Sequence, residues 1–245
     1  IGRGHHWDGV PPGARASQPV RLPRAGQVGP GGCFMPAGWF RCGGAGDESL
    51  PDRMLWCGDR VVSRFHVTNA DYIEFLDDLV GQGRSEEALR HAPRERAGMS
   101  GGDGALIYGF DGQRFRLEPD ADGDVWLERA PVLMIPWEAA AAYAVWLADR
   151  TGLPWRLPGE FEWEKAARGV DGRVYPWGSR IDPSWACTRG SSEGRVVPVE
   201  VDAFPVDVSP YGVRGMAGNA REWCADPFRP DGLDCIGQRV PASVP

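Results

Sequence analysis

Apolar residues recur at helical spacing in three parts of the chain. In the first part, Tyr72, Phe75 and Leu79 fall on one face of a helix. The second part is rich in alanine, the strongest helix former, and the third follows a Pro-Gly pair of the kind that precedes a helix. These patterns predict helices over residues 66–83, 136–152 and 158–169.

Capping residues mark where the predicted helices begin and end. Thr68 is a good N-cap residue, and Asp71 stands three positions later, where an acidic side chain completes a capping box. Gly81, Gly152 and Gly169 are placed to end the three helices, because glycine readily adopts the left-handed conformation that closes a helix.

Two other stretches predict strands. GGCFMPAGWFRCGG (31–44) alternates apolar residues between glycine clusters, as a short strand does. ALIYGFDGQRFRLEP (105–119) has an Asp-Gly pair near its centre, which is typical of a hairpin turn.

The composition favours a loop-rich fold. The 245 residues include 34 glycines, 22 prolines and 11 tryptophans, a mixture that suits irregular segments held by buried rings. A net charge of −7 argues against a nucleic-acid surface, and no apolar run is long enough to cross a membrane. No signal peptide opens the sequence, so we expect a cytoplasmic protein with neither nucleic acid nor membrane as a partner. Residues 1–30 are interpreted as a linker or the end of a preceding domain.

The cysteines form no recognisable metal motif. No CxxC pair is present, and the four histidines are not grouped with the cysteines, so the spacing argues against a zinc site. Scattered reduced thiols are the simpler interpretation. The six cysteines stand at positions 33, 42, 57, 187, 224 and 235.

The stretch WRLPGEFEWEKAARG (155–169) poses a choice between a catalytic carboxylate pair and a framework helix. Glu160 and Glu164 lie four residues apart and share a helix face, whereas Glu162 points elsewhere and is expected to be solvated. Glu164 and Arg168 have the spacing of an ion pair. Because no histidine, metal ligand or nucleophile stands nearby, we interpret this helix as a framework element.

Several blocks occur in a characteristic order: VTNADY, PWEAAAAYAVWLADRTGLPWRLPGEFEWEKAARG, YPWG and VDAFPVDVSPYGVRGMAGNAREWC. Together they resemble the formylglycine-generating enzyme (sulfatase-modifying factor) family over roughly residues 33–230. The resemblance implies an α+β, C-type-lectin-like fold that is loop-rich, with a few helices and short twisted strands. It also implies one domain over 31–245 that lacks its C-terminal segment, and it assigns the 155–169 block to the scaffold.

The insertion at 84–130 and the lead-in VRLPRAGQVGPGGCFMPAGWF (20–40) resemble one subgroup of this family. In that subgroup the module follows a bacterial serine/threonine kinase domain. The resemblance thus implies a kinase domain in a larger protein. Because the 245 residues contain no kinase motif, that domain would lie upstream of them.

Oxidase members of the family use a cysteine pair after an Arg-Gly-Gly-Ser segment, with which they bind Cu(I) and oxidise a substrate cysteine to formylglycine. Two thiolates suit Cu(I). This sequence ends at RVPASVP without such a segment, and Cys224 and Cys235 stand in another context. Arg221 also replaces the aromatic residue, most often Trp, that faces the active site in oxidase members. We therefore assign no catalytic residue.

The resemblance also implies a structural calcium site. Its ligands would be the carbonyl groups of Gly218 and Ala220 and the carboxylate of Glu222, and oxygen ligands of this kind suit calcium. Gly215 replaces the side-chain ligand expected three residues before Gly218. The alternative is that Glu222 pairs with a nearby basic group and binds no metal.

Two functions follow as hypotheses. The first is a non-catalytic module that binds a protein or a small molecule and serves as an accessory or sensory domain. The second is a copper-dependent formylglycine-generating oxidase whose cysteine pair lies outside these 245 residues. The identity of the ligand is left open.

Overall fold

The computed structural model describes most of the chain. The described residues are 9–17, 19–20, 22–24, 26–29, 31–44, 52–95, 104–120, 123–191 and 198–227. The stretch 1–30 is described only in part, and its role as a linker stays a prediction.

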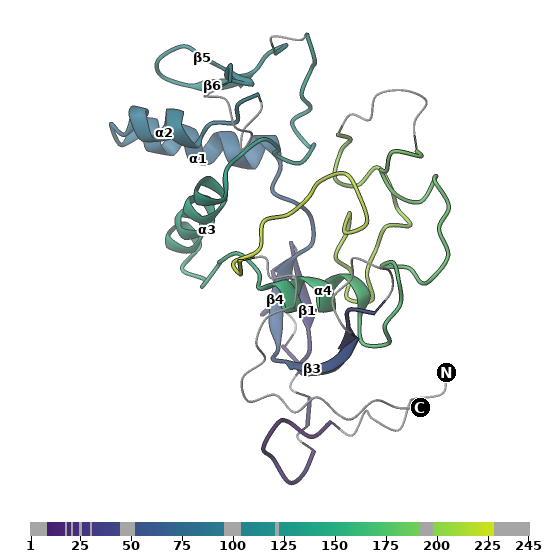
Figure 1. Ribbon diagram of the computed structural model, residues 1–245. Coiled ribbons are helices and arrows are strands. Elements are labelled where there is room, and N and C mark those ends of the chain that lie inside the picture. Colours follow the sequence, from purple (N-terminus) through teal and green to yellow (C-terminus); the bar gives the residue numbers. More distant parts are fainter. Residues whose placement is uncertain are drawn as a thin grey trace.

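Three helices and a hairpin make up one end of the molecule (Figure 1). Helices α1 and α2 are consecutive, α3 packs against both, and strands β5 and β6 pair in antiparallel fashion against α1. Rings and aliphatic side chains fill the space between them, with Tyr72 and Leu76 fully buried. The bounds are Asn69–Gly81 for α1, Ser85–His91 for α2, Trp137–Thr151 for α3, Tyr108–Phe110 for β5 and Phe115–Leu117 for β6.

Four short strands and one helix make up the other end. Strand β1 pairs with β4 and β2 pairs with β3, both in antiparallel fashion, while α4 packs on β2 and β3. Cysteine, methionine and alanine side chains supply most of this second core. The bounds are Gly32–Met35 for β1, Gly38–Cys42 for β2, Arg53–Cys57 for β3, Arg60–Ser63 for β4 and Glu160–Arg168 for α4.

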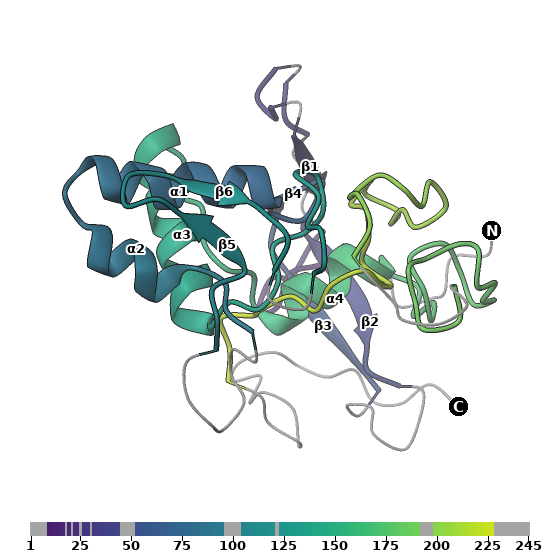
Figure 2. The same ribbon diagram turned by 90° about the horizontal axis from the view of Figure 1, so that it is seen from above.

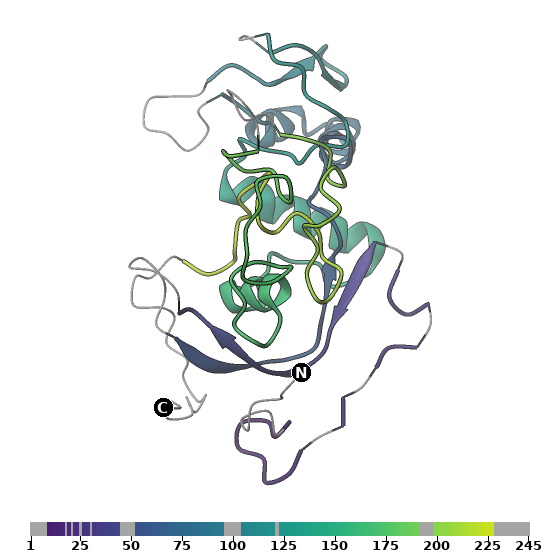
Figure 3. The same cartoon turned by 90° about the vertical axis from the view of Figure 1, so that its right-hand side faces the viewer.

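Residues 170–191 and 198–227 run as turns and irregular chain, much of which the turned views show beside α4 (Figure 2, Figure 3). Small sheets, few helices and much irregular chain confirm the α+β, loop-rich prediction. No helix among the described residues is long and apolar enough to cross a membrane.

The predicted caps Thr68, Gly152 and Gly169 are confirmed, whereas Gly81 is the last residue inside α1 and Gln82 follows it as the C-cap. The Thr68 hydroxyl accepts a hydrogen bond from the Asp71 N–H, and the Asp71 carboxylate accepts one from the Thr68 N–H, which completes the capping box. Gly152 closes α3 at a φ of 67°, a conformation that favours glycine. The 31–44 stretch, expected as one strand, forms two, because its Pro-Ala pair turns the chain between β1 and β2.

Candidate functional site

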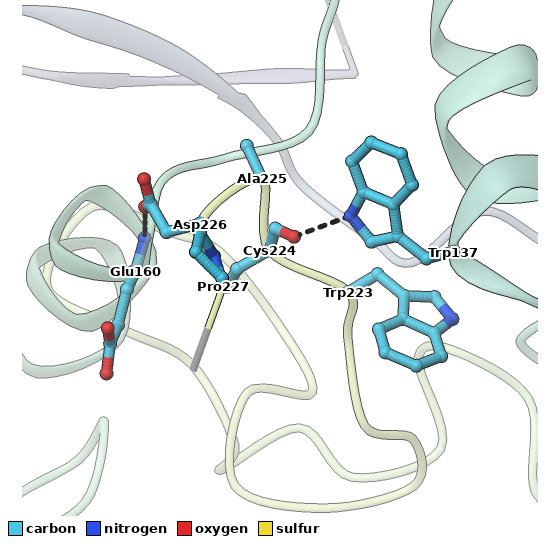
Figure 4. Close-up of a pocket in the computed structure, with 7 residues that line it drawn as sticks. All are labelled: Trp137, Glu160, Trp223, Cys224, Ala225, Asp226 and Pro227. Carbon is cyan, nitrogen blue, oxygen red and sulfur yellow. Dashed lines mark hydrogen bonds between the residues drawn. The ribbon is translucent and has the colours of Figure 1, made fainter. Parts of the chain in front are cut away.

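An open pocket of about 520 Å³ lies where α3 and α4 begin (Figure 4). The first residue of each helix lines it, and the other described lining residues belong to the segment 223–227. Its volume is within the range of small-molecule sites. The lining residues are Trp137, Glu160, Trp223, Cys224, Ala225, Asp226 and Pro227.

Two tryptophans form one side of this pocket, and reciprocal hydrogen bonds hold them. The indole N–H of Trp137 donates to the carbonyl of Cys224 at 2.9 Å, and that of Trp223 donates to the carbonyl of Ile135 at 3.0 Å. The segment 223–227 and the start of α3 are thereby tied together through the rings. Nevertheless Trp137 is 41% exposed and Trp223 is 47% exposed, so parts of both rings remain uncovered.

Two acidic residues form the opposite side (Figure 4). The carboxylate of Asp226 accepts a hydrogen bond from the Glu160 N–H at 2.7 Å, which satisfies a free N–H at the start of α4. No hydrogen bond or ion pair reaches the Glu160 carboxylate from the described part of the chain. Burial, followed by the charges of Asp226 and Glu164, raises the pKa of Glu160 above its ordinary value.

Cys224 is the only cysteine among the described residues that line the pocket. Burial, followed by the charges of Glu160, Glu222 and Asp226, raises the pKa of its thiol to about 11. The thiol is therefore protonated at neutral pH and is a poor nucleophile. Cys235 lies outside the described residues.

The predicted calcium ligands lie close to the pocket, on the same segment of chain. Oε1 of Glu222 lies 2.6 Å from Nε2 of His66, whose side chain is 8% exposed. The carbonyl of Gly218 accepts a hydrogen bond from the Ala220 N–H at 2.8 Å. Within the described ranges, no cluster of three or more His, Cys, Asp or Glu side chains has the arrangement of a metal site.

Gly215 makes room for the imidazole that contacts Glu222. A Cβ atom at Gly215 would lie 2.6 Å from Cε1 of His66, closer than two such atoms can approach. The space next to Gly215 is thus filled by the His66 ring. Gly218 is constrained in a similar way, since a Cβ atom there would lie 2.2 Å from the carbonyl oxygen of Cys187.

Two buried polar atoms near this contact have no hydrogen-bond partner among the described residues, namely Nδ1 of His66 and Oδ1 of Asp207. Burial raises the pKa of Asp207 to about 6, although a hydrogen bond from the Ala217 N–H opposes this. Spare oxygen atoms and the two carbonyl groups suit calcium. The His66 contact does not, because a calcium ion would have to displace the imidazole from Glu222. The residues therefore fit calcium only in part, and the calcium site stays a prediction.

The carboxylates of α4 have structural partners. Oε1 of Glu164 accepts a hydrogen bond from the Gly43 N–H at 2.8 Å and pairs with Arg168, as the spacing predicts. Glu162 was expected to be solvated, and this is wrong. Its side chain is 17% exposed and contacts Arg60, Arg156 and the Gly159 N–H. These contacts support the interpretation of α4 as a framework helix.

The tryptophans that define the pocket carry no sequence signal of a binding site. Trp137 and Trp223 stand 86 positions apart in the sequence, and neither carries a motif that marks it as a binding residue. The predicted Glu222 stands next to Trp223, so the block GNAREW was a signal of the right region. Arg221, in the same block, is exposed to solvent.

Comparisons with known proteins agree with this picture. The model of the sulfatase-modifying factor enzyme 1-like domain family matches residues 18–241. A solved structure of PvdO from Pseudomonas aeruginosa superimposes with a TM-score of 0.59 at 23% identity, covering 81% of this chain and 71% of that one. This likeness supports the fold.

Three curated relatives carry different names. The chain is 35% identical over 191 residues to hercynine oxygenase of Mycolicibacterium smegmatis, covering 75% of this chain but 41% of the relative. It is 28% identical over 236 residues to formylglycine-generating enzyme of Thermomonospora curvata, covering 85% and 74%. It is 38% identical over 113 residues to inactive C-alpha-formylglycine-generating enzyme 2 of Mus musculus, covering 42% and 34%.

Some members of this family bind calcium or copper. The relatives include proteins named as enzymes and one named as inactive, so membership alone leaves activity open. The match over most of the chain, together with the α+β fold, means that this chain belongs to the sulfatase-modifying factor enzyme 1-like domain family.

Proposed function

We propose that this domain is a non-catalytic ligand-binding module, and that the pocket between Trp137, Trp223 and Glu160 is its binding site. The observation that carries the proposal is the pair of half-exposed indoles, each held by a bond to a backbone carbonyl. Rings that are exposed yet fixed in place are typical of binding sites, because little conformational freedom is lost when a ligand packs on them.

Three features support a binding role over a catalytic one. The pocket cysteine has a raised pKa, and the Glu162 and Glu164 carboxylates of the neighbouring helix are engaged in structural contacts. A relative that bears the name of an inactive enzyme indicates that this fold is also used without the oxidase activity.

A fragment screen tests this proposal. Ligand-observed NMR of a small-molecule library should give binders that are lost in Trp223→Leu. The matched control is Trp177→Leu, because the indole N–H of Trp177 also donates to a backbone carbonyl, that of Arg180 at 2.7 Å, outside the pocket. Binders that survive Trp223→Leu and disappear in Trp177→Leu would place the binding site elsewhere and overturn the proposal.

The wider setting is also a proposal. The insertion at 84–130 and the lead-in to β1 support an accessory or sensory domain of a cytoplasmic, kinase-fused bacterial protein. The ligand would then be a small molecule or a protein, and an upstream kinase domain would be a partner within the same chain. Reading the gene upstream of Ile1 tests this directly, since an open reading frame without kinase motifs would contradict it.

A copper-dependent formylglycine-generating oxidase is the second candidate, favoured by the match to the Thermomonospora curvata enzyme. We expect the 245-residue chain to leave a sulfatase-type cysteine peptide unchanged even with Cu(I), as judged by mass spectrometry of the peptide. An aldehyde signal above a protein-free control would favour the oxidase. A downstream Arg-Gly-Gly-Ser segment followed by two cysteines would do the same.

A further inference from the structure

We propose that His66 and Gly215 together replace a bound calcium ion by an imidazole ring of the protein itself. In this arrangement the segment 215–222 is fastened to the chain between β4 and α1 without metal, and calcium binds only in competition with the ring. The inference concerns the predicted calcium ligands and does not depend on the proposed binding function.

The imidazole of His66 engages the one charged side chain in the predicted ligand set. Nε2 of His66 lies 2.6 Å from Oε1 of Glu222, and the His66 side chain is only 8% exposed. An ionised carboxylate can only accept a hydrogen bond, so the Nε2–H group is the donor of this bond. The contact therefore uses the carboxylate that calcium would need.

The same ring occupies the space in which a side chain at position 215 would lie. A Cβ atom at Gly215 would be 2.6 Å from Cε1 and 3.0 Å from Nδ1 of His66. The first of these distances is closer than two such atoms can approach, so the imidazole and a side chain at position 215 exclude each other. The predicted ligand set expects a side-chain ligand at this position. Gly215 and His66 are thus a matched pair, in which the first provides the space that the second fills.

Hydrogen bonds between protein groups fix the turn that carries the predicted carbonyl ligands, Gly218 and Ala220. The side-chain amide of Asn219 donates to the carbonyl of Val199 at 2.8 Å, and its oxygen accepts from the Val199 N–H at 2.9 Å. The Asn219 N–H donates to the carbonyl of Cys187 at 2.8 Å. Asn219 has a φ of 68°, a conformation that asparagine adopts more readily than most residues. Three bonds from one residue thereby hold the turn.

The beginning of the segment is attached to the same stretch of chain as its end. The N–H of Arg214 donates to the carbonyl of Arg64 at 2.8 Å. Arg64 stands two residues before His66, whose ring holds Glu222. Structural metal ions contribute to folding by joining segments in this way. Here a backbone bond and an imidazole make the connection.

The state of the ligand set predicts weak binding of calcium to the wild type. Calcium takes six to eight oxygen ligands. The carbonyl of Gly218 already accepts the Ala220 N–H at 2.8 Å, and Glu222 is engaged by His66. Calcium would have to displace the imidazole, and it would still lack a side-chain ligand at position 215.

A double-variant cycle tests the pairing. Gly215→Asn supplies a side-chain oxygen at position 215, and His66→Ala removes the ring that fills its space. Asparagine is chosen because it tolerates the φ of 79° at Gly215 better than most residues. With His66 present, Gly215→Asn should lower the melting temperature strongly, because the two side chains overlap. In the His66→Ala background the same substitution should lower it less, since residues in contact are coupled.

Isothermal titration with calcium, on protein first freed of metal with a chelator, tests the replacement. We expect the double variant His66→Ala/Gly215→Asn to bind calcium at least about tenfold more tightly than the wild type, because it offers two side-chain ligands that the wild type does not. Its melting temperature should rise in calcium and fall in chelator. The matched control is His91→Ala, since His91 is also a largely buried histidine near a glutamate, 3.8 Å from Glu87, but lies on α2.

Three results would overturn the inference. The first is a cost of Gly215→Asn that is equal with and without His66, because ring and side chain would then not compete. The second is wild-type binding of calcium that is as tight as that of the double variant. The third is binding of calcium by neither protein.

If the double variant does not fold, His66→Ala alone decides the question. It should bind calcium more tightly than the wild type, because Glu222 is released from the imidazole, and unchanged binding would overturn the inference. None of these results bears on the fragment screen of the pocket, so the failure of this inference and the failure of the proposed function are distinguishable.

Discussion

Around α1, α2 and α3 the core is built from rings and aliphatic side chains, whereas around α4 it is built mostly from cysteine, methionine and alanine side chains and lies beside one buried lysine ammonium group. Phe75 represents the first region, since its ring packs against four others, those of Tyr72, His91, Tyr143 and Trp146. Lys165 represents the second. It is 1% exposed, and its ammonium group donates to the carbonyls of Pro36, Gly38 and Cys57.

The difference teaches how each region is held in place. In the helical region, contacts between neighbouring rings are numerous, so the loss of one ring costs mainly packing. Near α4 the irregular chain is attached by single polar contacts over long sequence distances, such as Glu222 to His66 and Asp226 to the N–H of Glu160. There the loss of one group leaves a buried partner unsatisfied. Both the pocket and the predicted metal site belong to this second region.

The largest expected effect is on the aromatic core. We expect Phe75→Ala to lower the free energy of unfolding by about 3–5 kcal/mol, because it empties a large buried site. Phe40→Ala is the matched change in the other core, since Phe40 is also fully buried but has no ring pair among the described residues. Urea unfolding should show the larger loss for Phe75→Ala. A larger loss for Phe40→Ala would break the comparison.

In the second region, the contribution of Lys165 to the free energy of unfolding should depend on pH. Burial lowers the pKa of Lys165 from 10.5 to about 8. Between these two values the unfolded chain binds more protons than the native one, so the contribution of Lys165 to stability rises with pH and is complete above about pH 10.5.

The comparison variant for this test is Lys165→Met. The free energy of unfolding of the wild type, relative to Lys165→Met, should increase by about 3 kcal/mol from pH 7.5 to pH 10.5. Urea unfolding at several pH values measures this difference, and the subtraction removes the titration of other groups. A difference that stays constant over this range would show that the lysine keeps its ordinary pKa in the folded protein.

Calcium binding tests the second region alone, because the predicted ligands Gly218, Ala220 and Glu222 all lie there. At a hundredfold excess over its dissociation constant, calcium would raise the free energy of unfolding by about 2.7 kcal/mol. The imidazole of His66 must first leave Glu222, so we expect His66→Ala to reach the same rise in melting temperature at a lower calcium concentration. Glu222→Gln should blunt the response. Identical melting curves in calcium and in chelator for all three proteins would count against the site.

The smallest expected effect concerns Glu162. Burial by itself would raise its pKa, but hydrogen bonds from Arg156, the Gly159 N–H and Arg60 lower it to about 2. Its contribution to stability is therefore present above about pH 4.5 and is lost as the pH falls towards 2. We expect Glu162→Gln to cost about 1–2 kcal/mol at pH 7 and progressively less towards pH 2. A cost that is equal at both pH values would mean that packing, and not charge, anchors this side chain.

The sequence by itself determined the local elements. The Thr68 capping box, the glycine that closes α3 and the Asp-Gly hairpin were all predictable, because each depends on residues within a few positions of one another. The ion pair of Glu164 with Arg168 was predictable for the same reason, since one helical turn separates them. The ordered blocks also indicated the family, and the family model confirms it.

Only the tertiary structure decided which distant groups meet. Glu162 was expected in solvent, yet the guanidinium group of Arg60, 102 positions away, donates a hydrogen bond to its carboxylate. His66 reaches Glu222 across 156 positions, and its place beside Gly215 depends on a space that no local pattern records. The pocket likewise combines the start of α3, the start of α4 and the segment 223–227. Helix caps and turns follow from local backbone geometry, whereas these contacts depend on how separate elements pack, which is decided by the whole core at once.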